Sequence, residues 1–172
     1  MIDLRVAHTA SLGAARALLE EVFRGDLSDD DWEHALGGVH ALVWEDGELV
    51  GHAALVQRRL LHGGRALRTG YVEGVGVRSD RRRGGHGAAM MAGLEGVLRR
   101  AYDVGAVAST DDAAEFYAGR GWMPWRGRTA ALTPAGIVPT EDEDGAVYVF
   151  PLAASLDAGA ELTCDWRDGD LW

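Results

Sequence analysis

The chain has 172 residues, of which 47% are hydrophobic, so we expect one domain, residues 1–172, with a substantial core. Its net charge of −10 argues against nucleic acid, whose binding depends on Lys and Arg, and favours a cationic partner. No apolar run reaches the ~18 residues of a membrane helix and no signal-peptide pattern opens the chain, so we expect a cytoplasmic protein without membrane contact.

The first half of the chain predicts two helices, then three antiparallel strands. Ser11 and either Ser28 or Asp29 are suitable caps for the helices, and Asp46-Gly47 is a strong hairpin signal. The expected helices are 12–23 and 29–36, and the expected strands are 39–45, 48–57 and 66–77.

The second half predicts alternating helices and strands. The expected elements are a helix at 85–101, a strand at 105–109, a helix at 112–119, and strands at 122–125 and 146–152. The proline-containing stretch 126–145 is expected to be a loop, and the residues after 152 an irregular acidic tail. The order of elements indicates a mixed α/β (α+β) domain.

An arginine- and glycine-rich turn, residues 82–87, joins an apolar strand to a helix. Its glycines allow successive N–H groups to face an anion at the start of the helix, where the macrodipole is positive. We call residues 82–87 the anion-binding turn and expect a pyrophosphate there. A plain surface turn is the alternative, because 24 residues of the chain are Gly.

Acidic residues gather in three segments, 26–33, 141–144 and 165–170, whereas arginines gather at 78–83. Such segments are either ordinary solvated surface or a site for a cation. Taken together with the net charge, they favour a polycationic partner.

The pattern Arg82-x-x-Gly85-x-Gly87 resembles the acetyl-CoA signature of the GNAT N-acetyltransferases. The resemblance implies acetyl-CoA as co-substrate, and a mostly antiparallel mixed sheet with a splayed parallel pair and flanking helices. It implies that main-chain atoms of the strand hold the pantetheine arm and that the anion-binding turn holds the pyrophosphate. The residues so implied are Val75, Gly76, Val77, Arg82, Arg83, Gly84, Gly85, His86 and Gly87.

Longer segments resemble the actinobacterial aminoglycoside 2'-N-acetyltransferases, from about residue 5 to the end. Examples are Asp31-Trp32-Glu33-His34, Tyr71-Val72-Glu73-Gly74-Val75, Gly121-Trp122-Met123-Pro124-Trp125 and Cys164-Asp165-Trp166-Arg167. The resemblance implies aminoglycoside contacts at Asp26, Asp31, Glu73, Gly74, Asp142, Glu143, Asp170 and the terminal carboxylate of Trp172. Ala108 stands where relatives carry a serine, so Ser109 is the candidate for that sugar hydrogen bond. The relatives imply a homodimer.

Glu73 is the candidate base, because an amine attacks acetyl-CoA only after losing its proton. It is expected to bind the ammonium directly or to deprotonate it through a water. The alternative is a solvated glutamate on an edge strand, against which Gly74 and Gly76 argue, since glycine in a strand often marks close ligand approach.

Tyr117 is the candidate acid for the leaving thiolate, with a buried core tyrosine as the alternative. No metal is expected, because the histidines lack metal-ligand spacing and Cys164 is the only cysteine.

The expected reaction is direct acetyl transfer to the 2'-amine of an aminoglycoside in a ternary complex, which would confer resistance. One rival substrate is a metabolic amino sugar, thiol precursor or polyamine. Another rival is a binding module without turnover.

Overall fold

The computed structural model describes residues 1–6 and 9–172; one of the histidines for which no metal-ligand spacing was found, His8, lies outside them. The α-helices described are α1 Thr9–Val22, α2 Asp29–His34, α3 His86–Ala101 and α4 Ala114–Ala118. The strands are β1 Ile2–Val6, β2 Val39–Glu45, β3 Glu48–His62, β4 Arg65–Val77, β5 Val104–Ala108, β6 Met123–Pro124, β7 Thr129–Thr133, β8 Gly136–Pro139, β9 Val147–Pro151 and β10 Leu162–Cys164. Short 3₁₀ turns lie at Ser79–Arg81, Asp111–Ala113 and Glu141–Glu143.

The chain divides into two compact units. Unit 1 is Met1–Val56 with Val72–Val97, and unit 2 is Gln57–Tyr71 with Leu98–Trp172. Strands β3 and β4 contribute residues to both, and the single domain remains a prediction. None of the helices described is long and apolar enough to cross a membrane.

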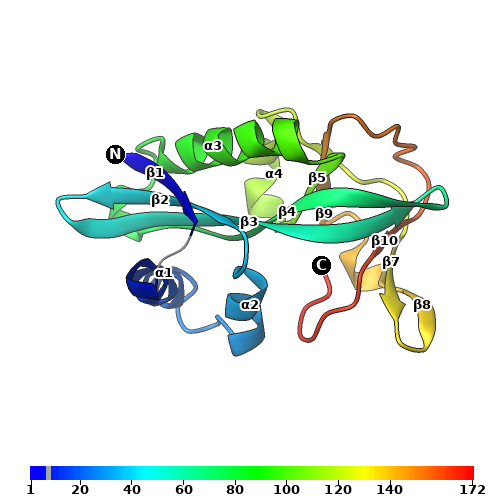
Figure 1. The fold of residues 1–172 in the computed structure, drawn as a ribbon, viewed down its shortest axis with the longest axis horizontal. Coiled ribbons are helices and arrows are strands. Elements are labelled where there is room, and N and C mark those ends of the chain that lie inside the picture. Colours follow the sequence, from blue (N-terminus) through cyan, green and yellow to red (C-terminus); the bar gives the residue numbers. More distant parts are fainter. Residues whose placement is uncertain (7–8) are drawn as a thin grey trace. The chain divides into compact units, whose positions relative to one another are not determined.

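In unit 1, helices cover both faces of a sheet (Figure 1). Strand β2 pairs antiparallel with β1 and β3, and α1 and α2 pack on one face through Leu19 and Trp32. On the opposite face, α3 brings Met90 against the backbone of Gly51. The hairpin predicted at Asp46-Gly47 is confirmed, since both residues have positive φ, 50° and 84°.

In unit 2, the strand order is β6-β9-β5-β4-β3-β10-β7-β8. The expected parallel pair is β4 with β5, in register from Thr69↔Val104 to Tyr71↔Ala106. A second parallel pair, β10 with β7, was not expected. Buried aromatic side chains, among them Trp122 and Trp125, fill the core of this unit.

Two sequence expectations were wrong, and one strand was missed. The stretch 126–145 contains the hairpin β7–β8 rather than a loop, and its outer strand is exposed, which explains why proline is tolerated there. The tail is not wholly irregular, because β10 pairs with β3 and β7. Strand β1 was missed at the N-terminus, where Ile2 and Leu4 are 41% and 43% exposed and give only a weak apolar signal.

Helix boundaries also differ from the sequence prediction. Helix α1 begins at Thr9 rather than after Ser11, and the helix expected at 112–119 is a 3₁₀ turn followed by the short α4. Strand β3 continues to His62. The cap of α2 is confirmed at Ser28, whose hydroxyl accepts from the N–H of Asp31.

Gly38 is fixed by the backbone of β3, because a Cβ atom there would lie 2.0 Å from the carbonyl oxygen of Leu55. We expect Gly38→Ala to lower the free energy of unfolding by about 2 kcal/mol or more, since backbone must move. Gly96→Ala is the control: its Cβ meets nothing within 4 Å, and alanine favours a helix interior by ~0.5–1 kcal/mol. Urea unfolding measures both, and equal stability of the two variants would contradict this packing.

Candidate active site

The anion-binding turn follows β4 and leads into α3, all within unit 1. Arg83 and Gly85 have positive φ, 64° and 82°, which turns successive peptide groups in alternating directions. Among the residues described, the N–H groups of Arg82, Arg83, Gly84 and Gly85 donate to no backbone carbonyl. Unpaired N–H groups at the start of a 16-residue helix suit a phosphate ligand.

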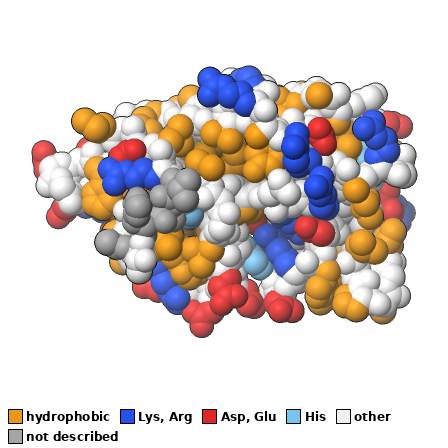
Figure 2. Space-filling view, viewed as in Figure 1, with side chains coloured by type: hydrophobic (Ala, Val, Ile, Leu, Met, Phe, Trp, Pro, Cys, Tyr) orange, Lys and Arg blue, Asp and Glu red, His pale blue; other side chains and the backbone are white. Residues whose placement is uncertain are grey.

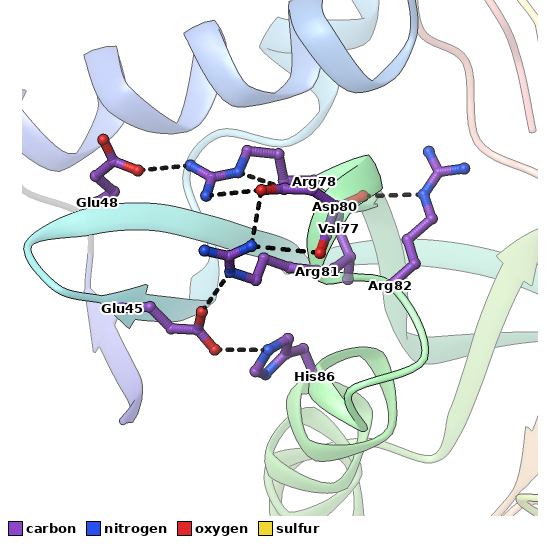
Figure 3. A network of polar contacts seen from close by, with 8 residues as sticks. All are labelled: Glu45, Glu48, Val77, Arg78, Asp80, Arg81, Arg82 and His86. Atoms are coloured by element: carbon purple, nitrogen blue, oxygen red, sulfur yellow. Dashed lines mark hydrogen bonds and ion pairs between the residues drawn. The ribbon is translucent and has the colours of Figure 1, made fainter.

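The arginines of this region fall into two classes (Figure 3). Arg78 pairs with Glu48 and Asp80, and Arg81 pairs with Glu45 and Asp80. These four ion pairs already neutralise both guanidinium groups, although Arg78 and Arg81 belong to the cluster of arginines noted at 78–83 in the sequence.

Arg82 and Arg83 are exposed and have no carboxylate partner within the described part of the chain. Nε of Arg82 donates to the carbonyl of Val77 at 3.2 Å, and its guanidinium points away from the ion-pair network in Figure 3. The positive charge available to an anion at this turn therefore comes from these two residues.

The His86 side chain lies 2.8 Å from a carboxylate oxygen of Glu45. Its imidazole therefore faces the ion-pair network, which leaves its backbone N–H for a ligand. The Val77 carbonyl accepts from Arg82, so part of the main chain predicted to hold pantetheine already has a partner.

Glu73 and Gly74 lie in the last part of β4, which belongs to unit 1. Glu73 is half-buried, and Gly74 has a positive φ of 55°, a conformation that favours glycine. A Cβ atom at Gly76 would lie 3.0 Å from Leu19 of α1. The glycines that suggested a ligand site therefore also have local structural roles.

Two further acidic candidates of unit 1 differ in their surroundings. Asp26 is exposed, whereas Asp31 is half-buried and its carboxylate accepts from the N–H of Ser28 at 2.9 Å as part of a capping box. Acidic side chains gather in Figure 2 where α2 lies in Figure 1. Asp31 can contact a cation only with the acceptor capacity that the cap leaves.

Tyr117 is buried in unit 2 among the rings of Phe116, Trp122 and Tyr148. Burial raises the pKa of its hydroxyl to about 12, so the phenol keeps its proton at neutral pH. Ser109 is half-buried, and its hydroxyl lies 3.4 Å from the carbonyl of Thr110.

An open pocket of about 670 Å³ lies in unit 2 between the turn that follows β8 and the end of the chain. We call it the acidic pocket; its lining residues are Pro139, Thr140, Glu141, Asp142, Glu143, Gly169, Asp170 and Leu171. Within the described chain, Asp142, Glu143 and Asp170 form no ion pair. Burial raises the pKa of Glu143, and the charges of Asp170 and Asp142 raise it further.

Arginines hold the tail that forms one wall of this pocket. The side chain of Arg58 is only 5% exposed; it donates to the carboxylate and the carbonyl of Asp165 and to the carbonyl of Leu171. Arg167 donates to the carbonyl of Asp170 and to an oxygen of Trp172 at 2.9 Å. We call Arg58 and Arg167 the arginine clamp.

The last residue is buried rather than frayed. Trp172 is 5% exposed, and its indole N–H donates to the hydroxyl of Thr140 at 2.9 Å. The tail thus folds back onto the segment that carries Asp142 and Glu143. Arg167 therefore already binds an oxygen of Trp172, the residue predicted to offer a carboxylate to the substrate, before any substrate arrives.

Neither the arginine clamp nor Thr140 was predicted from the sequence. One signal for the clamp was present in the sequence. Arg58 occupies an inward-facing position of its strand, because Val56, Arg58 and Leu60 alternate with exposed residues. No group of three or more potential metal ligands occurs among the residues described. The described residues thus leave N–H groups without backbone acceptors and two arginines without carboxylate partners at a turn of unit 1, and three carboxylates without ion pairs at a pocket of unit 2.

Comparison with known proteins identifies the family. Residues 3–124 match a family model described as an acetyltransferase (GNAT) domain. An aminoglycoside 2'-N-acetyltransferase from Mycolicibacterium fortuitum is 49% identical over 177 residues, covering 98% of this chain and 91% of the relative. The chain belongs to the aminoglycoside 2'-N-acetyltransferase family of GNAT acetyltransferases.

Solved structures agree with the GNAT fold of this acetyltransferase. Escherichia coli ElaA has a TM-score of 0.58 at 19% identity, with 87% of this chain and 99% of that chain covered. Eis1 from Mycobacterium abscessus has a TM-score of 0.60 at 21% identity, with 74% of this chain and 33% of that chain covered. An N-acetylglutamate synthase from Neisseria gonorrhoeae, complexed with coenzyme A and N-acetyl-glutamate, has a TM-score of 0.59 at 18% identity, covering 87% and 34%. The acetyltransferase spans about a third of the last two chains.

Removing the buried guanidinium should release the tail. We expect Arg58→Met to lower the free energy of unfolding by about 2–3 kcal/mol, since Asp165 and the Leu171 carbonyl lose their donor, and to make the tail susceptible to proteolysis. Arg59→Met, at the exposed neighbouring position, is the control. Limited proteolysis followed by mass spectrometry reads the outcome, and a tail as resistant as in the wild type would refute the clamp.

Because the pKa of Glu143 is raised, removing its charge should increase the thermal stability of the protein in a pH-dependent way. The folded chain holds this proton more tightly than the unfolded chain, so the associated stability is lost as pH rises through the folded pKa. Glu143→Gln should therefore raise Tm by about 1–3 °C at pH 7 and leave it unchanged near ~pH 4. Glu115→Gln, at an exposed position of α4, should change neither value; a lower Tm for Glu143→Gln at pH 7 would show that this carboxylate is stabilising.

Proposed function

We propose that this acetyltransferase transfers the acetyl group of acetyl-CoA to the 2'-amine of aminoglycoside antibiotics, by direct attack in a ternary complex. The observation that carries the proposal is the acidic pocket, where three carboxylates lie together without a cationic partner in the described chain. Aminoglycosides are polycations, so each ammonium group that enters relieves repulsion among these carboxylates. The Mycolicibacterium fortuitum relative is named for the same activity.

The anion-binding turn is the proposed site of the acetyl-CoA pyrophosphate. Its N–H groups without backbone acceptors, together with Arg82 and Arg83, suit two phosphates at the start of α3. The main chain of Val75, Gly76 and Val77 is proposed to hold the pantetheine arm. When bound, acetyl-CoA supplies an acyl thioester that an amine can attack without a covalent acyl-enzyme.

Glu73 is the proposed proton acceptor for the attacking ammonium. It sits half-buried beside the Gly74 bend of β4, where a carboxylate can hold an ammonium or remove its proton through a water. Asp26, Asp31, Gly74 and Ser109 are proposed further substrate contacts, with Asp31 limited by its capping role.

Tyr117 is the proposed proton donor to the departing thiolate. Its buried hydroxyl keeps its proton at neutral pH. Since a thiolate with a pKa near ~8.5 leaves readily, this proton should contribute less than Glu73. Within this proposal the protein acts in the cytoplasm as a homodimer.

The rival substrate is a metabolic amino sugar or polyamine, with aminoglycosides as incidental substrates. The deciding experiment is the rate of thiol release with tobramycin, with aminoglycosides that carry a hydroxyl group at 2', and with spermidine and glucosamine. The proposal expects turnover of the 2'-amino drugs only. Faster turnover of glucosamine or spermidine would favour the rival, and no turnover of any amine would favour a binding module.

Glu73→Gln keeps the shape of the side chain but removes its ability to accept a proton. We expect kcat to fall about 10²-fold or more and the alkaline rise of the pH profile to shift. Tyr117→Phe should cost less. Steady-state kinetics with tobramycin measure both, and a larger loss for Tyr117→Phe would reverse the two roles.

Arg82→Ala removes one of the two uncommitted charges of the anion-binding turn. The KM for acetyl-CoA should rise about 10-fold while the KM for tobramycin stays near its native value, because a guanidinium attracts phosphate and repels an ammonium. Arg100→Ala, at an exposed position of the last turn of α3, is the control. A rise confined to the KM for tobramycin would remove the turn from the acetyl-CoA site.

A further inference from the structure

Two buried histidines lie beneath the bend of β4 in unit 1. His40 on β2 and His52 on β3 are 1% and 0% exposed, and their rings are joined by a contact of 2.9 Å between Nδ1 of His40 and Nε2 of His52. Nδ1 of His52 lies 2.7 Å from the carbonyl oxygen of Gly74. Neither side chain has a role in the reaction described above.

The chain of contacts fixes the proton on each ring. A carbonyl only accepts, so Nδ1 of His52 carries the hydrogen and Nε2 of His52 is the acceptor. Nδ1 of His40 must then be the donor to that atom, which leaves Nε2 of His40 as a buried acceptor without a partner among the described residues. Burial lowers the pKa of both imidazoles, that of His52 to about 4, which favours the neutral form of each.

The carbonyl that His52 contacts belongs to a residue with left-handed backbone, Gly74. Gly74 has a φ of 55°, and a Cβ atom there would lie 3.4 Å from the His52 ring and 3.1 Å from Leu19. The ring centroids of His52 and Trp32 lie 6.4 Å apart. Trp32 directly follows Asp31 in α2. The imidazole therefore touches the bend that carries Glu73 and lies near the helix that carries Asp31.

We propose that His52, oriented by His40, is a positioning residue that holds the Gly74 carbonyl and thereby fixes the direction of Glu73 toward the amine. This inference rests on the proposed function, because it takes Glu73 as the proton acceptor. His52 does not itself carry the proton of the reaction, since its Nδ1 faces a carbonyl and its Nε2 faces His40. The His52 N–H donates to that carbonyl at 2.7 Å from inside the buried core, where a hydrogen bond is stronger than in water, and so holds the bend in place.

Two substitutions at His52 separate this role from simple packing. The amide nitrogen of asparagine reaches the place of Nδ1 and can still donate to Gly74, whereas the amide of glutamine reaches the place of Nε2 and cannot. Both remove a buried imidazole, so both should lower Tm. Only His52→Gln should lower kcat, by about 10-fold with the KM for acetyl-CoA near native, while His52→Asn should stay within about 2-fold of the wild type.

The matched control is His62, a buried histidine of unit 2. Its Nδ1 lies 3.1 Å from the carbonyl of Glu161, and its Nε2 accepts from the N–H of Asp157 at 3.0 Å. His62→Asn and His62→Gln should lower Tm and have equal kcat.

The assay uses tobramycin turnover by folded protein, with nitrogen-15 NMR of the wild type as a readout free of substrate. The inference expects the Nδ1–H tautomer at His52 and a difference in kcat between the two His52 variants. The Nε2–H tautomer, or equal kcat for the two variants, would overturn it. Absence of tobramycin turnover by the wild type would instead defeat the proposed function, and the tautomer would still test the hydrogen bond to Gly74.

Discussion

The buried guanidinium of Arg58 holds the C-terminal tail on unit 2. A charge that is 95% shielded from water is costly unless acceptors surround it, and the tail supplies them from Asp165 and Leu171. Tyr71 lies beneath the same guanidinium, with its ring centroid 4.6 Å from Cζ. Because these acceptors lie on both sides of Asp170, satisfying Arg58 also brings Asp170 to the acidic pocket.

In both units, some of the described charged side chains form ion pairs within the chain and others are left without a partner of opposite charge. In unit 1, the carboxylates of Glu45, Glu48 and Asp80 satisfy Arg78 and Arg81, which leaves Arg82 and Arg83 for an anion. In unit 2, the arginine clamp satisfies tail groups, but the carboxylates of the acidic pocket stay together and raise the pKa of Glu143. The anion-binding turn and the acidic pocket thus offer opposite charges, as expected of an enzyme that we propose joins an anionic cofactor to a cationic amine.

Local signals in the sequence predicted much of the fold. The Asp46-Gly47 turn, the cap at Ser28 and strand β2 were predicted correctly, because turn chemistry and apolar alternation act over a few residues. Strand β10 was missed because its pairing with β3 and β7 joins segments far apart in the sequence. Strands of the β7–β8 hairpin have a mixed polar and apolar pattern at an exposed edge, which resembles a loop.

The site residues likewise divide into those that a local sequence motif reveals and those that depend on contacts between distant segments. The anion-binding turn was visible as a sequence motif, but the sequence could not show that Arg78 and Arg81 are committed to ion pairs whereas Arg82 and Arg83 are not. It could not reveal that Asp31 is a helix cap or that Arg167 binds the Trp172 oxygen. Such assignments depend on which partner each charge finds in the folded chain.

The central claim is the position of acetyl transfer, and the most direct measurement is two-dimensional NMR of tobramycin after turnover with acetyl-CoA. The account predicts a single product in which the acetyl carbonyl is coupled through the amide to the proton at C2'. A product acetylated at another amine, or a mixture without preference for 2', would contradict it.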